Sequence, residues 1–254
     1  MIIIRRISSI FSLLAVLALF EILVFNPNWF LYIILILEAI VVISIIGLAW
    51  KKIELKEIWQ FLIPPVFLIA SAYIFIFFVE GVISTQLFIF FVVFLYGVFI
   101  ENTFLYLYQP VKYQPYALEN ISAYVNLVSV FFMGASFHSN MVFFGTSGAM
   151  SALFVLIFTY VLVIQMIWIN KIVLKGNYTV AGMLALLVAE IFWATVFLPS
   201  SYLVNGIIIA LSYYFLVGIF RYWLLKSLDR KVFKRYIIIS VSVFIVVALS
   251  ARWT

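Results

Sequence analysis

The chain has 254 residues, of which 68% are hydrophobic and 9% charged, and its mean hydropathy is +1.30. Soluble globular domains contain about 45–50% apolar and about 25% charged residues, so this composition excludes a soluble domain and indicates a protein solvated by lipid. The formal net charge of +6 comes from basic residues in short loops beside apolar segments, a pattern that indicates membrane topology and anionic headgroups, not nucleic acid. Cysteine is absent, which excludes disulfides, thiolate catalysis and cysteine-ligated metals.

A helix that crosses a bilayer needs about 20 mainly apolar residues. Nine segments meet this requirement and predict an all-α, polytopic helical bundle that forms one transmembrane domain over residues 1–254. In chain order they cover roughly 7–25, 29–50, 58–80, 86–105, 118–138, 145–169, 178–198, 201–225 and 236–251. The first is longer than the apolar region of a secretory signal, about 7–15 residues, so we expect it to be retained. The ninth is the shortest, and a re-entrant or tilted interfacial helix is the alternative there.

Fourteen of the fifteen Lys and Arg residues fall on one side of the membrane when these spans alternate in direction. They are Arg5, Arg6, Lys51, Lys52, Lys56, Lys112, Lys171, Lys175, Arg221, Lys226, Arg230, Lys231, Lys234 and Arg235, and only Arg252 falls on the other side. Because Lys and Arg concentrate in cytoplasmic loops, we expect the N-terminus in the cytoplasm and the C-terminus outside. The Ile, Phe, Lys and Asn usage is typical of a prokaryote, so the predicted location is the cytoplasmic membrane.

Two glutamates fall inside predicted spans, where an ionisable group is costly and is by default a functional hypothesis. Glu38 lies nine residues after Trp29, and Glu190 lies nine residues before Pro199, which places both about 13 Å from the outer helix ends. If their helices face each other, the two carboxyl groups could share a proton or hold a cation. The alternative is that each is protonated and hydrogen-bonded to a neighbouring helix.

Two further pairs of residues are candidates for a site or for packing. His138 and Asn140 begin a predicted outer turn, where the only histidine of the chain could bind a ligand from outside or titrate near neutral pH; a solvated turn residue is the plainer interpretation. Glu101 and Arg221 lie in the inner halves of their spans and could form a structural ion pair, unless Arg221 extends to the cytoplasm instead.

Gly145-Thr146-Ser147-Gly148-Ala149 locally resembles the Gly-x-Ser-Gly element of rhomboid intramembrane proteases, in which the serine at a helix start is the nucleophile. The resemblance covers five residues. Such a serine needs a base within hydrogen-bond reach, yet no histidine follows Ser147, and His138 precedes it by nine residues. A helix start made of small residues, which permits close helix packing, is the simpler explanation.

These observations predict a small permease-like binding or transport module, or a subunit of one, with a polar site at Glu38, Glu190, His138 and Asn140. A non-catalytic assembly or anchoring subunit of an envelope complex is the first alternative, and a membrane enzyme acting on lipid-linked substrates is the second. We expect no cofactor and no bound metal. The expected partners are the lipid bilayer, anionic headgroups at its cytoplasmic face, and a membrane protein or a second copy of the chain.

Overall fold

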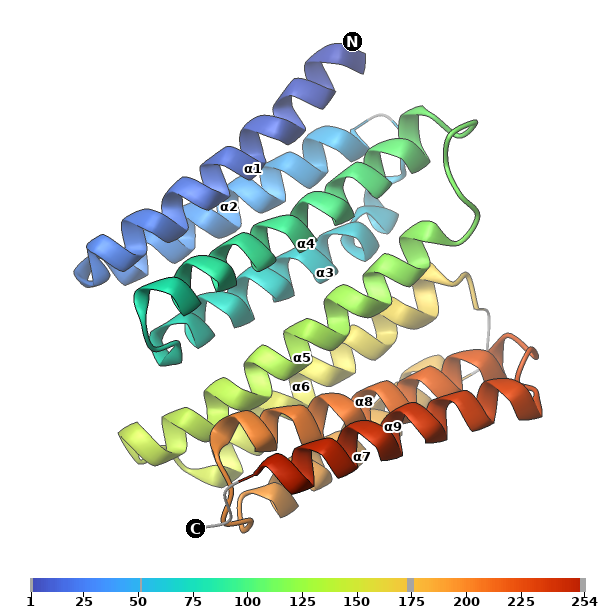
Figure 1. Ribbon diagram of the computed structural model, residues 1–254. Coiled ribbons are helices and arrows are strands. Elements are labelled where there is room, and N and C mark those ends of the chain that lie inside the picture. Colours follow the sequence, from blue (N-terminus) through green and yellow to red (C-terminus); the bar gives the residue numbers. More distant parts are fainter. Residues whose placement is uncertain (1, 51, 173–175, 252–254) are drawn as a thin grey trace. The chain divides into compact units, whose positions relative to one another are not determined.

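The computed structural model describes residues 2–50, 52–172 and 176–251 (Figure 1). These residues form nine α-helices, each long and apolar enough to cross a membrane. The chain is therefore a multi-pass integral membrane protein, and the predicted all-α polytopic bundle is confirmed. The helices are α1 (Ile2–Phe25), α2 (Phe30–Ala49), α3 (Leu55–Phe75), α4 (Val82–Tyr108), α5 (Ala117–Phe144), α6 (Gly148–Ile169), α7 (Asn177–Thr195), α8 (Tyr202–Leu224) and α9 (Arg230–Ser250).

The chain divides into two compact units, Met1–Ser129 and Val130–Thr254, with the boundary inside α5. A single transmembrane domain over the whole chain stays a prediction. The sidedness of the basic residues also stays a prediction, since Lys51, Lys175, Arg252 and the side chain of Lys56 lie outside the described residues.

Several helix ends differ from the prediction: α1 begins at Ile2 instead of 7, α3 ends at Phe75 instead of 80, and α4 begins at Val82 instead of 86. Helix α5 runs to Phe144 instead of ending at His138, because no residue breaks it before Gly145, whose φ of 66° is left-handed and typical of the residue after a helix. Helix α9 begins at Arg230, because the Asp229 side chain accepts a hydrogen bond from the N–H of Val232 at 2.7 Å and caps it. Helix α7 ends at Thr195, ahead of its predicted end at 198.

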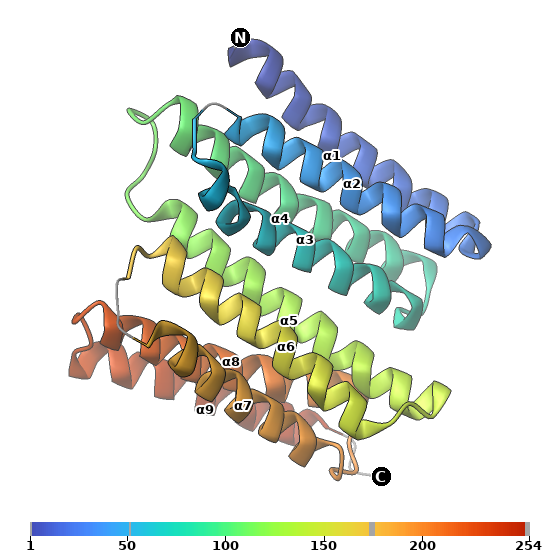
Figure 2. The ribbon, with the colours of Figure 1, turned by 180° about the vertical axis from the view of Figure 1, so that it is seen from behind.

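In the first unit, α1 packs against α2 and α4, and α3 packs against the same two helices (Figures 1 and 2). Leu37, Val41 and Ile45 of α2 are fully buried. Their spacing of four residues places them on one face of the helix, and this face is buried where α2 packs against α1, α3 and α4. The opposite face of α2, with Leu35 and Ile43 exposed, is left for lipid.

Arg5 of α1 connects this helix to the C-terminal end of α2 and to α4. Its guanidinium donates to the carbonyl oxygens of Gly47 at 2.7 Å and Leu48 at 3.0 Å, and it also bonds the hydroxyl of Tyr108. The last carbonyls of a helix have no partner within that helix, and a cation near them also interacts favourably with the helix dipole. Arg5 therefore closes the end of α2. Arg6 instead forms an exposed ion pair with Glu101 at 3.4 Å and lies over the ring of Phe104.

In the second unit, α6 and α7 form the most extensive helix pair, and α8 packs against α6, α7 and α9. Residues 130–144 of α5 lie against this group, with Phe137 stacked on Phe154 of α6 at 5.8 Å between ring centroids. Helix α9 is nearly all exposed, and Val247 is its one buried residue in the described part. It packs mainly on α8, where Tyr236 stacks on Tyr214 at 4.7 Å.

A glycine sets the distance between α5 and α8. A Cβ atom added at Gly206 would lie 2.8 Å from the Cβ of Ala135 and 3.0 Å from its backbone nitrogen. Small residues let helix backbones approach closely in a membrane, where lipid tails provide no hydrophobic drive for association. The close contact between α5 and α8 therefore depends on the absence of a side chain at residue 206.

We predict that Gly206→Val destabilises the protein, whereas the same change at Gly47 does not. A Cβ at Gly47 meets nothing within 4 Å, so this control carries the same change in helix propensity without the overlap. Overpacking costs about 1–3 kcal/mol, which is the expected difference in free energy of unfolding between the two variants. Unfolding of the full chain in mixed micelles measures it, and equal stabilities would contradict the close contact.

Candidate functional site

Glu38 is the predicted site residue whose surroundings are most unusual. It lies on α2, eight residues after Phe30, which corresponds to about 12 Å of helical rise. Its neighbour Leu37 is fully buried, and both carboxyl oxygens of Glu38 are shielded from solvent and have no hydrogen-bond partner. Because buried polar groups in native proteins are nearly always hydrogen-bonded, this carboxyl group needs a proton, a cation or water as its partner.

Hydroxyl groups from two other helices lie near this region of the first unit. Tyr96 of α4 is fully buried and is close enough to Glu38 to interact with its charge. The Tyr96 hydroxyl donates a long hydrogen bond of 3.5 Å to Ser12 of α1. The Ser44 hydroxyl of α2 lies beside Tyr96 without a hydrogen bond of normal geometry. Tyr96 thus connects Ser12 of α1 with Ser44 of α2, and the Glu38 carboxyl lies within range of its charge. These four residues are called the polar cluster.

Of the residues in this cluster, only Glu38 was predicted from the sequence as a site residue. Tyr96 is one of 15 tyrosines, and Ser12 and Ser44 are isolated hydroxyls in apolar runs. Serine in a transmembrane helix commonly bonds a carbonyl of its own helix, as Ser12 does to Ser9 at 2.8 Å. Only the packing of α1 and α4 against α2 distinguishes these hydroxyls from the others.

Glu190 has different surroundings from Glu38. It is exposed, and it lines a shallow, mainly apolar groove between α6 and α7 together with Leu153, Leu186 and Trp193. Because α7 ends at Thr195, Glu190 lies five residues, or about 7.5 Å, from that end, closer than the predicted 13 Å. Glu38 and Glu190 belong to different units, so the predicted facing of the two carboxyl groups stays a prediction.

His138 is a buried residue within α5 and does not lie in a solvated turn. Its Nδ1 lies 2.9 Å from the carbonyl oxygen of Gly134, and its Nε2 lies 3.1 Å from the hydroxyl of Thr195 at the end of α7. A carbonyl only accepts, so Nδ1 carries the proton of the neutral ring. The Thr195 hydroxyl also lies 2.7 Å from the carbonyl oxygen of Phe192, and its one proton is shared between that oxygen and Nε2. The ring also contacts Phe192 at 4.5 Å between centroids, so His138 joins α5 to α7.

Asn140, the other predicted residue of this turn, is half-buried on the same helix. Ser139, between the two, is fully buried and its hydroxyl has no hydrogen-bond partner. Near the start of α8, Ser200 donates to the buried Asn205 at 2.6 Å. Several polar groups thus lie in the last turns of α5 and α7 and the first turn of α8, but no described contact links them to Glu190.

Glu101 and Arg221 each have another partner within their own unit. Glu101 pairs with Arg6 at 3.4 Å, and the Nε of Arg221 donates to Asn170 at 2.9 Å. Asn170 follows α6 and also donates to the carbonyl of Met166 at 2.7 Å, so Arg221 connects the ends of α6 and α8. The predicted pair of Glu101 with Arg221 would join residues of different units and stays a prediction.

Ser147 shows no catalytic arrangement with His138 in the described residues. Ser147 is exposed, directly precedes α6 and forms no side-chain cap, while both ring nitrogens of His138 are engaged by Gly134 and Thr195. Gly145 terminates α5, with its N–H donating to the carbonyl of Met141 at 3.2 Å. The five residues that resemble the rhomboid element therefore form a tight turn between two helices.

Outside the spans, Tyr113 organises the loop between α4 and α5. Its hydroxyl donates to Glu119 at 3.1 Å and accepts from the N–H of Leu118 at 3.0 Å. Partial burial raises the pKa of Tyr113 to about 12, and the charge of Glu119 acts in the same direction, while the backbone bond from Leu118 lowers the pKa. The phenol thus satisfies a free N–H in the first turn of α5.

We predict that Tyr113→Phe lowers stability by no more than about 1 kcal/mol, the net value of one ordinary hydrogen bond. Because the folded-state pKa lies above the ordinary 10.0, the contribution of Tyr113 is fully present below pH 10 and is lost as pH rises through about 12. The difference in stability between wild type and variant should therefore vanish at the alkaline end. Tyr116→Phe, at an exposed tyrosine of the same loop, is the control, and an equal loss there would contradict the role of Tyr113.

Among the described residues, no three of His, Cys, Asp and Glu come together in a way that could hold a metal ion. Neither a protein-family model, nor a curated protein, nor a solved structure matches this chain. The function is therefore argued from the residues and their surroundings.

Proposed function

We propose that this integral membrane protein is a small permease-like binding and transport module, and that Glu38 binds a proton or a cation within the first unit. The observation that supports it is the carboxyl group of Glu38, which is shielded from solvent and has no hydrogen-bond partner. Ionisable residues within transmembrane segments cost about 2.5–3.5 kcal/mol on insertion scales and typically mark ion and proton pathways. The proposed setting is the cytoplasmic membrane of a prokaryote, from the sequence pattern alone.

The chemistry of the cluster fits binding, not covalent catalysis. A carboxylate is a ligand for hard cations, and a proton would neutralise Glu38 equally well. Tyr96, which interacts with the charge of Glu38 and lies near Ser12 and Ser44, would orient the site. Transport further requires that Glu38 meets water from one side of the membrane at some stage, because a proton or cation can only be exchanged with water.

Because residue 38 must meet water at some stage, we predict that a cysteine introduced there can be labelled. The chain has no cysteine of its own, so Glu38→Cys in the full chain, reconstituted in vesicles, reports only on residue 38. We expect it to react with a water-soluble thiol reagent. Ile36→Cys is the control, since Ile36 lies on the same helix with 48% of its surface exposed to the surrounding lipid, and it should not react.

The second variant, Glu38→Gln, separates function from packing. It keeps the size of the side chain and removes the titrating group, so we expect the fold to persist while the infrared band of the Glu38 carboxyl group disappears from the difference spectrum. Equal protection of the thiols in the Glu38→Cys and Ile36→Cys variants would overturn the transport proposal and leave Glu38 a packing residue.

A second function, that of a membrane-embedded assembly subunit, is favoured by one observation. Glu190 is exposed within the span of α7, in a groove whose other lining residues are apolar or aromatic. A polar side chain that faces hydrocarbon is stabilised by a partner helix, and such a hydrogen bond contributes about 1–2 kcal/mol in model peptides. We propose that Glu190 would then contact a second copy of the chain.

Under this second proposal Glu190→Leu weakens self-association roughly five- to thirtyfold, the factor that corresponds to about 1–2 kcal/mol. Energy transfer between differently labelled copies in vesicles measures the change over a range of lipid-to-protein ratios. Met183→Leu, seven residues earlier on the same exposed face of α7, removes no polar group and is the matched control. Equal association of the two variants would exclude Glu190 as the contact.

A further inference from the structure

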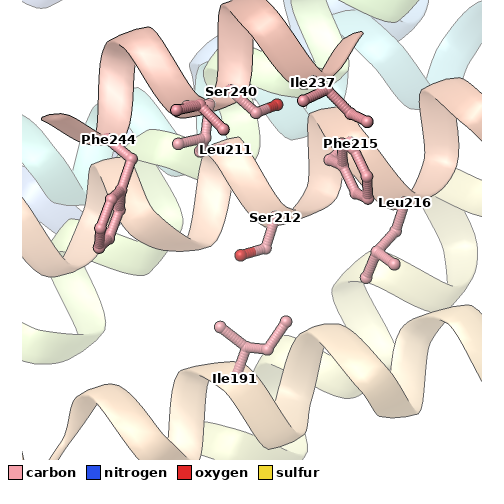
Figure 3. Close-up of a pocket in the computed structure, with 9 residues that line it drawn as sticks. Ile191, Leu211, Ser212, Phe215, Leu216, Ile237, Ser240 and Phe244 are labelled. Carbon is pink, nitrogen blue, oxygen red and sulfur yellow. The ribbon is translucent and has the colours of Figure 1, made fainter. Parts of the chain in front are cut away.

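A groove in the second unit opens between α7, α8 and α9 (Figure 3). Its volume is about 380 Å³, and apart from two serines its lining is apolar, with Leu211, Phe215 and Phe244 prominent. Ser212 of α8 and Ser240 of α9 are the small residues that leave the space open, and Ser212 points across it towards Ile191 of α7 (Figure 3). The Ser212 hydroxyl bonds the carbonyl of Ile208 at 2.8 Å, so it presents little free polarity to the groove.

The groove ends beside a cluster of basic residues. On α9 its lining begins at Ile237, three residues after Lys234 and seven after Arg230, which places both cations on the same side of the helix and within about two turns. Ile237, Ser240, Val241 and Phe244 lie along one stripe of α9, and at about 100° per residue this stripe continues towards the helix start through Lys234 and Arg230. Lys231 and Arg235 face away from the groove by the same count.

The basic cluster has little acidic charge near it in the chain. Residues 226–235 contain five Lys or Arg residues and one acidic residue, Asp229, and Asp229 caps α9 through the N–H of Val232. Arg230 and Lys234 are exposed and form no ion pair within the described residues. A concentrated positive charge at the end of an apolar groove is complementary to one kind of molecule, an amphiphile with an anionic head and an apolar tail.

We propose that this groove binds one anionic glycerophospholipid of the surrounding bilayer. An acyl chain would occupy the groove between α7, α8 and α9, and the phosphate would lie against Arg230 and Lys234, which are long enough to reach the headgroup layer. Arg and Lys form charge-assisted hydrogen bonds with phosphate. This site lies wholly within the second unit and does not depend on the proposed role of Glu38.

The test compares lipid retention by the full chain. Protein in mild detergent is mixed with phosphatidylglycerol or phosphatidylcholine of identical acyl chains, and native mass spectrometry counts the lipids that remain bound. We expect one phosphatidylglycerol to be retained in preference to phosphatidylcholine. The double variant Arg230→Gln/Lys234→Gln should weaken this retention roughly ten- to thirtyfold, as expected for the loss of two basic side chains near an anionic group.

Two further variants separate a site from general attraction to charge. Lys231→Gln/Arg235→Gln removes the same charge from the same turns of α9 but from the other side, and it should retain phosphatidylglycerol as wild type does. Ser212→Phe fills the groove without changing the charge, and it should abolish retention while circular dichroism shows an intact helical fold. Equal losses in both double variants, unchanged retention in Ser212→Phe, or equal retention of both lipids would each overturn the proposal.

Discussion

The structure depends first on the requirement that backbone N–H and C=O groups be satisfied without water in the hydrocarbon core. Each unsatisfied group costs several kcal/mol there, so the described chain is made of long helices joined by short turns. The requirement is hardest to meet at the helix ends, where four carbonyls or four N–H groups lack partners within the helix. Side chains meet it in several places: Arg5 bonds the last carbonyls of α2, Tyr113 accepts from an N–H at the start of α5, and Asp229 caps α9.

The lipid environment also determines which interactions hold the helices to one another. Lipid tails are as apolar as leucine, so helices associate through close packing and a few polar contacts. Gly206 lets α8 approach Ala135 of α5, and a Cβ at Gly218 would likewise overlap the ring of Tyr236 on α9. The contact of His138 with Thr195 adds a polar connection between α5 and α7. These features explain why the second unit needs small and polar residues at positions where a soluble core would carry larger apolar ones.

The same packing gives the ionisable residues very different surroundings, although the sequence presents them alike. Glu38 and Glu190 both interrupt apolar runs at similar distances from a predicted turn. The carboxyl group of Glu38 is shielded within the first unit, whereas Glu190 is exposed on the surface of α7. His138 reverses the expectation of an exposed residue, because α5 continues past it and buries it against α7. A role in binding, in association or in packing follows from these surroundings and not from residue type.

The sequence by itself determined the membrane class, the all-α architecture, the number of spans and the approximate position of each span. The reason is that the length and hydropathy of a spanning segment are local properties set by the thickness of the bilayer. The sequence located the helix ends less well where one residue decides them, as Gly145 does for α5 and Asp229 for α9. Only the tertiary structure decided which groups lie side by side: Tyr96 with Ser12, His138 with Thr195, Arg221 with Asn170, and the apolar groove with the basic start of α9. Such contacts join residues far apart in the chain, and they depend on which face of each helix packs against its neighbour, which nearly uniform hydrophobic spans do not encode in their pattern.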